Sequence, residues 1–209
     1  DQAFVFKTGG AVHKALNVQD SEIKGYAKGV FYLNVAATVN ELTFNNCLIH
    51  DVECDGGDMF DSRKGRIDKL TISNSTIYNS CAGRDFIRMD DASSLGGTPL
   101  IKVDHCTIDG VVGSSSKRML YVRYGGNGGH TIEWNNNIVT NVKGVWSNQS
   151  KTTPAAFDGN VYFNCPKLNF KDGPTSEGGT GTNLFVDEKK TEANPDYKDA
   201  AKGDFTVLN

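Results

Sequence analysis

Hydrophobic and polar residues alternate at a spacing of two in many short stretches of this chain, which is the period of a β-strand rather than a helix. Four stretches align without gaps, and two weaker copies flank them. They are LTFNNCLIHD (42–51), LTISNSTIYN (70–79), IKVDHCTIDG (101–110) and IEWNNNIVTN (132–141), with LNVQDSEIKG (16–25) and AAFDGNVYFN (155–164) outside them. The third residues of the copies are Val18, Phe44, Ile72, Val103, Trp134 and Phe157. This recurrence predicts one structural unit repeated about six times.

Each copy predicts a strand, a sharp bend and a second strand. The first and third residues of a copy are expected to point inward, and the second and fourth outward. A polar residue then stands at the same place in each of the four best copies: Asn46, Asn74, His105 and Asn136. Asn tolerates the left-handed backbone of a bend, and stacked amides can form a ladder between coils. After the bend, Ile49, Ile77, Ile108 and Val139 are predicted to return to the interior.

A second set of short strands precedes these copies. Its members are FVFKT (4–8), VFYLN (30–34), MFDSR (59–63), FIRMD (86–90), MLYVR (119–123) and GVWSN (144–148). Coils of 23 to 31 residues with at least two strands each are typical of a parallel β-helix. A leucine-rich repeat has an overlapping period, but its Leu consensus is absent. We therefore predict an all-β, right-handed parallel β-helix of about six coils, forming a single domain over residues 1–209.

This second set also predicts a binding face. By alternation, one outward row contains Phe6, Tyr32, Asp61, Arg88, Tyr121 and Trp146, and the next contains Thr8, Asn34, Arg63, Asp90, Arg123 and Asn148. Aromatic rings pack on the apolar faces of sugars, while Arg and Asp give directed hydrogen bonds to hydroxyl groups. The predicted carbohydrate-binding residues are Tyr32, Asp61, Arg63, Arg88, Asp90, Tyr121, Arg123, Tyr124 and Trp146. For the charges alone, a surface ion-pair ladder is the alternative.

Composition narrows the functional classes. The net charge of −3 argues against a nucleic-acid-binding surface, and no apolar run is long enough for a membrane helix. The start at Asp1 fits a mature protein or an excised module. A secreted or cell-surface location is the expectation that the family resemblance given below implies. Polysaccharide is then the expected partner, with no nucleic acid and no membrane.

The five cysteines divide into two groups. Cys47 and Cys106 fall in one inward column two coils apart, too far for a bridge, and are predicted to be small buried residues. Cys54 and Cys81 fall at the same position of adjacent coils, where they can form a disulfide or remain as two loop thiols. A bridge there would indicate an oxidising, secreted setting.

An enzyme is the competing interpretation, because many β-helices are polysaccharide lyases. Such a lyase needs a Lys or Arg base and often Ca²⁺ held by acidic side chains. The chain has such residue types, including Arg118 and the acidic pairs Asp90–Asp91 and Asp55/Asp58, but they form no compact motif. We therefore expect no catalytic residue and no cofactor, with Ca²⁺ the one metal ion left open.

Two segments, IYNSCAGRDFIRMDDASS (77–94) and SSSKRMLYVRYGGNGG (114–129), resemble pectate-lyase-superfamily β-helix domains of Bacteroidales. The end of the chain, NLFVDEKK followed by AAKGDFTVLN, resembles the closing coil of that superfamily. GRDFIRMDD is also loosely similar to a strand of chondroitinase-B-type lyases, but Asp85-Phe86 replaces their Glu-Thr, and their calcium ligands and catalytic Lys/Arg pair have no match here.

In size and character the chain is most similar to family 89 of carbohydrate-binding modules. That resemblance implies a non-catalytic, xylan-binding module fused to a glycoside hydrolase. Two further hypotheses remain open: a calcium-dependent lyase acting on a polyuronate such as pectin or alginate, and an adhesin-like β-helix without glycan specificity.

Overall fold

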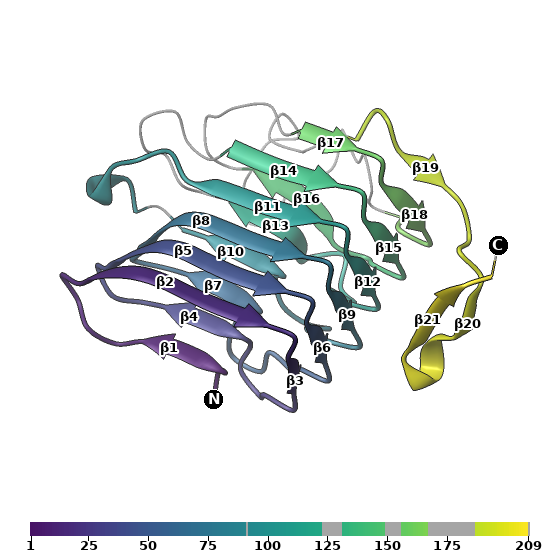
Figure 1. Cartoon of the computed structure of the whole chain (residues 1–209), viewed down its shortest axis with the longest axis horizontal. Coiled ribbons are helices and arrows are strands. Elements are labelled where there is room, and N and C mark those ends of the chain that lie inside the picture. The colour runs from purple at the N-terminus through teal and green to yellow at the C-terminus, as the bar shows by residue number, and fades with distance from the viewer. Residues whose placement is uncertain (91, 123–130, 149–155, 167–186, 209) are drawn as a thin grey trace.

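Three parallel sheets form the walls of a right-handed coil (Figure 1). The computed structural model describes residues 1–90, 92–122, 131–148, 156–166 and 187–208, and only the backbone of residues 93 and 145–148. Each coil contributes one strand to each wall, so the predicted parallel β-helix of about six coils is confirmed.

The strands of the three walls follow one another in the same order in every coil. Sheet A contains β1 (Phe4–Phe6), β4 (Phe31–Leu33), β7 (Phe60–Ser62), β10 (Ile87–Met89), β13 (Arg118–Val122) and β16 (Val145–Asn148). Sheet B contains β2 (Val12–Gln19), β5 (Thr38–Asn45), β8 (Arg66–Ser73), β11 (Leu100–Asp104), β14 (Thr131–Asn135) and β17 (Ala156–Asp158). Sheet C contains β3 (Glu22–Lys24), β6 (Leu48–His50), β9 (Thr76–Tyr78), β12 (Thr107–Asp109), β15 (Ile138–Thr140), β18 (Val161–Phe163) and β19 (Thr191–Glu192).

The core is a set of apolar columns inside the coil. The six third residues of the sequence copies pair directly with one another along sheet B, as the alignment predicted. Phe44, Ile72, Val103 and Trp134 of this column are completely buried, as are Ile49, Ile77, Ile108 and Val139 of sheet C. Burying such side chains contributes about 1.5–3 kcal/mol each, so these columns are the main source of stability.

The predicted bends lie between sheets B and C. Asn46, Asn74, His105 and Asn136 all have positive φ angles, between 50° and 56°. The amides form a diagonal ladder: Asn46 Nδ2 donates to Asp20 Oδ1 at 2.6 Å, and Asn136 Nδ2 donates to Asp104 Oδ1 at 3.0 Å. A second left-handed column, which the sequence analysis did not identify, follows sheet C and contains Asp51, Asn79, Asn141 and Asn164.

Polar side chains also lie inside the coil, directly after the first bend. Asn137 is fully buried; its Oδ1 accepts from the Cys106 N–H at 3.0 Å, and its Nδ2 donates to the Val103 carbonyl at 3.1 Å. Asn160, one coil further, accepts from the Asn137 N–H at 3.0 Å. These side chains form hydrogen bonds with backbone groups that lose their partners in the sheets at the bend.

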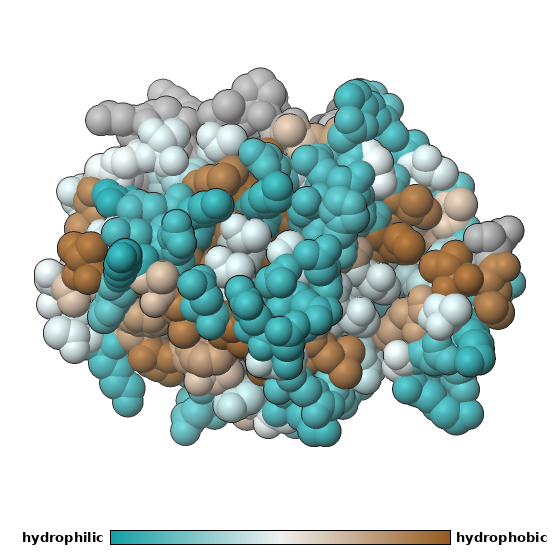
Figure 2. All heavy atoms as spheres, viewed as in Figure 1, coloured by the Kyte–Doolittle hydropathy of each residue, from teal (hydrophilic) through white to brown (hydrophobic). Residues whose placement is uncertain are grey.

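The outer face of sheet B is hydrophilic. It faces the reader in Figures 1 and 2, where it is covered largely by hydrophilic residues. Thr71, Lys102 and Glu133 lie side by side in one outward row of this wall.

The C-terminal hairpin lies against sheet C. Strands β20 (Tyr197–Asp199) and β21 (Asp204–Val207) pair antiparallel around the short 3₁₀ helix η3 (Ala200–Lys202). The hairpin stands beside the sheet C strands in Figure 1, and the Phe205 ring contacts the Tyr78 ring with centroids 5.1 Å apart. A further 3₁₀ helix, η1 (Ser93–Leu95), precedes β11. The described residues contain no helix that could span a membrane.

We predict that Asn137→Ala lowers the free energy of unfolding by about 2–4 kcal/mol, because it leaves a buried N–H and a buried carbonyl without partners. The thermal midpoint would fall by about 10 °C. Asn17→Ala, at an exposed position of β2, is the control and should change the midpoint by less than about 2 °C. Equal midpoints for the two variants would contradict the role assigned to Asn137.

Candidate functional site

The outer face of sheet A carries the predicted row over its four central strands. Tyr32, Asp61, Arg88 and Tyr121 pair directly with one another from β4 to β13. Their chain neighbours on both sides, such as Phe60 and Ser62, are buried. The alternation deduced from the sequence is therefore correct for these strands.

The prediction is wrong at both ends of the row. Trp146 was aligned with Tyr121, but its backbone pairs with Leu120, and Ser147 stands opposite Tyr121. The reason is a shift in register between Arg118 and Leu120, which a gapless alignment cannot represent.

At the other end, Val5 rather than Phe6 stands opposite Tyr32. Phe4 and Phe6 both pack against the core, the ring of Phe4 lying 6.0 Å from that of Phe44, and Val5 is left 39% exposed. Burial of two Phe rings thus decides the register of β1.

Some predicted site residues lie outside the described residues. Arg123 and Tyr124 are among these, and so is the side chain of Trp146. The described site therefore contains six of the nine residues predicted to bind carbohydrate: Tyr32, Asp61, Arg63, Arg88, Asp90 and Tyr121.

Burial corrects the expectation of an open aromatic row. Tyr121 is completely buried although it is not part of the hydrophobic core, and Asp61 is 1% exposed. The guanidinium carbons of Arg118 and Arg88 lie 3.4 and 5.3 Å from the Tyr121 ring centroid. Tyr121 is thus a stacking partner for two arginines and not a free surface for a sugar ring.

Solvent reaches fewer side chains of this face than the nine that were predicted to bind carbohydrate. Tyr32 is partly exposed, and the side chains of Arg63, Arg88 and Asp90 are 31%, 18% and 12% exposed. These four residues come from three successive coils. They are the part of the predicted site that a ligand could contact.

Asp58 lies beneath the two exposed arginines and joins them. Its Oδ2 accepts from Arg63 Nη2 and from Arg88 Nη1, both at 3.3 Å, and its side chain is 3% exposed. Its Oδ1 accepts from the Asp85 backbone N–H at 3.1 Å. One buried carboxylate therefore fixes guanidinium groups of two adjacent coils.

Asp85 repeats this arrangement one coil further. Its Oδ1 accepts from the Arg118 backbone N–H at 2.8 Å and from Arg118 Nε at 3.0 Å, while its Oδ2 accepts from Arg118 Nη2 at 3.0 Å. Arg118 is buried by this pairing. The bidentate geometry matches the planar guanidinium fork to the carboxylate.

The remaining pairs complete a network. Asp61 accepts from Arg63 Nε at 2.9 Å, and Asp90 accepts from Arg88 at 2.9 and 3.1 Å. Arg63, Arg88 and Arg118 each have at least one carboxylate partner. These three guanidinium groups share the four carboxylates of Asp58, Asp61, Asp85 and Asp90. The described network therefore has no uncompensated positive charge.

Burial and charge set the protonation of this network. Desolvation is the main reason that the pKa of Asp61 is raised to about 6, with the Arg63 hydrogen bond opposing it and the Asp58 charge adding to it. Desolvation likewise raises the pKa of Asp85. Burial alone would lower the pKa of Arg63 and of Arg88, but the hydrogen bonds and charges of Asp61 and Asp90 raise both above the ordinary value. Arginines held in this way are poor proton acceptors.

The sequence analysis did not include Asp58, Asp85 and Arg118 in the binding site. A signal was present in the sequence. Asp58 stands two residues before Phe60, and Asp85 stands two residues before Ile87; Phe60 and Ile87 are inward residues that pair with each other. A carboxylate recurring at one position of two successive coils indicates a structural column. Arg118 gave no comparable signal, since it occupies that position only once.

Metal binding finds no support in the described part of the chain. No group of three or more His, Cys, Asp or Glu side chains among those residues could hold a metal ion. The acidic side chains of sheet A bind arginines instead.

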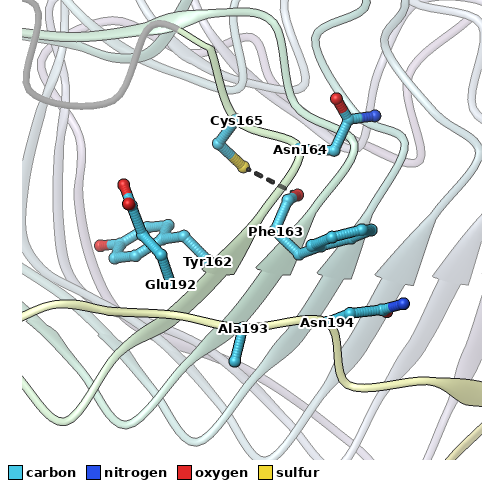
Figure 3. Close-up of a pocket in the computed structure, with 7 residues that line it drawn as sticks. All are labelled: Tyr162, Phe163, Asn164, Cys165, Glu192, Ala193 and Asn194. Carbon is cyan, nitrogen blue, oxygen red and sulfur yellow. Dashed lines mark hydrogen bonds between the residues drawn. The ribbon is translucent and has the colours of Figure 1, made fainter.

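The cavities we find lie along sheet C and the turns that follow it. One, of about 270 Å³, lies between β18 and β19, with Tyr162 and Glu192 on one side and Phe163 and Asn194 on the other (Figure 3). Hollows of about 430 and 480 Å³ share the turn residues Asp51, Asn79 and Gly110. The first is below the usual size of a ligand pocket.

Comparison with known proteins gives two matches, both to family models. The model described as "Domain of unknown function (DUF5123)" matches residues 101–209, and the one described as "Domain of unknown function (DUF4957)" matches residues 1–80. No curated protein and no solved structure is significantly similar to the chain.

We predict that the buried Asp61 carboxyl makes stability depend on pH. Because its folded pKa lies above its ordinary value of 3.8, the folded state binds the proton more tightly, and ionisation costs stability as the pH rises from about 4 to about 6. The free energy of unfolding of the wild type relative to Asp61→Asn should therefore fall by about 2 kcal/mol between pH 4 and pH 7.

Urea denaturation at these two pH values measures the difference. Asp55→Asn, which removes an exposed carboxylate, is the control and should follow the wild type at both. A gap between the wild type and Asp61→Asn that stays constant with pH would contradict the prediction.

Proposed function

Given that the chain belongs to the family described as "Domain of unknown function (DUF5123)", we propose that it is a non-catalytic carbohydrate-binding module. The ligand we propose is a plant cell-wall polysaccharide, xylan in particular, bound on the outer face of sheet A. The observation that carries the proposal is the network on this face, in which buried carboxylates hold Arg63 and Arg88 with part of each side chain exposed.

The geometry of the wall suits an extended glycan. Adjacent strands of a sheet are roughly 4.8 Å apart, which is close to the advance per sugar in an extended polysaccharide. Tyr32, Arg63 and Arg88 come from three adjacent strands or their ends, so a chain crossing the coils would meet a new side chain at each sugar. Tyr32 offers an aromatic surface, and the guanidinium groups donate to hydroxyl oxygens.

Charge balance favours a neutral ligand. Arg63, Arg88 and Arg118 each already have a carboxylate partner, so these described guanidinium groups offer a uronate no unpaired positive charge to offset the loss of its hydration. Xylan has a neutral backbone, and its hydroxyl groups can share donors and acceptors that the ion pairs leave unused. Polyuronates would instead require a more basic surface.

Binding without cleavage is supported by the same ion pairs. A lyase base must accept a proton, and Asp58, Asp61 and Asp90 keep the guanidinium groups of Arg63 and Arg88 protonated. We further propose, from the resemblance described above, a secreted or cell-surface module attached to a glycoside hydrolase.

A calcium-dependent polysaccharide lyase is the second candidate. The observation in its favour is the raised pKa of Asp61, because strongly perturbed carboxyl groups concentrate at active sites. Its test is the appearance of unsaturated, ultraviolet-absorbing products from pectin or alginate with Ca²⁺ present. We expect none, and products from either substrate would overturn the non-catalytic proposal.

We predict that Arg88→Lys weakens binding to soluble xylan at least tenfold. Lys keeps the charge but loses the planar fork that can hold Asp90 and a sugar hydroxyl together. Tyr32→Ala should weaken binding similarly, because it removes the aromatic surface. Calorimetry or affinity gels would measure both.

The matched control is Lys102→Ala, which removes a partly exposed cation from sheet B and should leave the affinity unchanged. Thermal midpoints within a few degrees of the wild type would show that the variants are folded. Unchanged affinity in both folded sheet A variants would refute the site, and absence of binding by the wild type to every neutral glycan would refute the function.

A further inference from the structure

Cys54 and Cys81 occupy equivalent turns in adjacent coils. Both have left-handed backbone, with φ angles of 57° and 55°, and both carbonyls accept from the N–H three residues later, that of Gly57 and that of Arg84, at 3.4 Å. The Cys81 N–H donates to the Val52 carbonyl of the preceding coil at 2.8 Å. The two turns therefore lie against each other in adjacent coils.

Their side chains meet inside the molecule. Each residue is 1% exposed, and both are free thiols in this structure that interact with each other. Stacked positions of adjacent coils are roughly 4.8 Å apart, within the Cα separations of 4.4–6.8 Å that disulfides span. Cys47 and Cys106 share a column but have Ser75 between them, since Ser75 and then Cys106 follow Cys47 in successive coils. Cys54 and Cys81 are therefore the cysteines placed to react with each other.

We propose that Cys54 and Cys81 are a cross-linking site, joined by a disulfide when the chain folds under oxidising conditions. The oxidant is a disulfide compound, such as oxidised glutathione. One cysteine thiolate attacks its S–S bond, releasing one reduced thiol and forming a mixed disulfide. The second cysteine thiolate then attacks the mixed disulfide and releases the second thiol. Two electrons pass from the cysteines to the oxidant, and the two protons they lose protonate the released thiols.

The bond belongs to the folding stage. In the completed coil, desolvation raises the pKa of the Cys81 thiol well above its ordinary value, so the reactive thiolate is scarce. The same burial protects an existing bond from external thiols. The cross-link is thus a structural clamp and not a reversible surface switch.

The clamp would act on the network of sheet A. Asp58 and Asp85 each follow their cysteine by four residues, and Cys81 Sγ donates to the Asp85 carbonyl at 3.2 Å. These two aspartates hold Arg63, Arg88 and Arg118. A bond between the turns would fix the spacing of the carboxylates that orient the arginines.

Thiol counting tests the proposal on the whole chain. The protein is refolded with a mixture of reduced and oxidised glutathione, denatured, alkylated and weighed by mass spectrometry. We expect three of the five cysteines to be alkylated, and a proteolytic peptide pair linked through Cys54 and Cys81. Five alkylated cysteines, or a bond to any other cysteine, would overturn the proposal.

A thermal measurement gives a second test that needs no variant. Reduction during unfolding should lower the midpoint of the oxidised wild type by about 5–10 °C, because the bond closes a long loop in the unfolded chain. The double variant Cys54→Ala/Cys81→Ala should show no such shift, whereas Cys165→Ala should keep it. A wild-type midpoint insensitive to reduction would also count against the clamp, whatever the glycan affinity.

Discussion

The structure depends on the stacking of equivalent residues in successive coils. In a parallel β-helix, each residue pairs with the residue at the equivalent position one coil away. Every side chain must therefore pack or pair favourably with the side chains at that position of the adjacent coils. Apolar columns meet this condition easily. Charged residues meet it on this face because a guanidinium group of the next coil binds each buried carboxylate, as Arg88 binds Asp58 and Arg118 binds Asp85.

The sheet A face shows what this condition means for the proposed binding site. Here the described ionised groups are paired within their own coil or with an adjacent coil, and the buried members lose hydration that the pairing must offset. The exposed parts of Arg63 and Arg88 are consequently rigid. A rigid donor loses little conformational freedom when it binds a hydroxyl group, which favours the recognition of a stiff polysaccharide.

Sequence periodicity was sufficient to predict the fold and most of the site's register. The columns of Phe44 and Asn46 could be read directly, because hydrophobic alternation and left-handed bends follow from local chemistry. The register of Trp146 could not, because one irregularity near Arg118 shifts every later residue of that wall. The burial of Tyr121 could not be predicted either, because alternation shows on which side of a sheet a residue lies but not what covers it.

The continuous strand pairing of sheets A, B and C has a consequence for how the two matched segments evolve. The two family matches cover residues 1–80 and 101–209, and β10 lies between them, yet β7, β8 and β9 pair directly with β10, β11 and β12 of the next coil. A recombination event at this border would leave each product with a row of unpaired backbone groups on all three walls. The two segments are therefore expected to pass between genomes together, as one evolutionary unit.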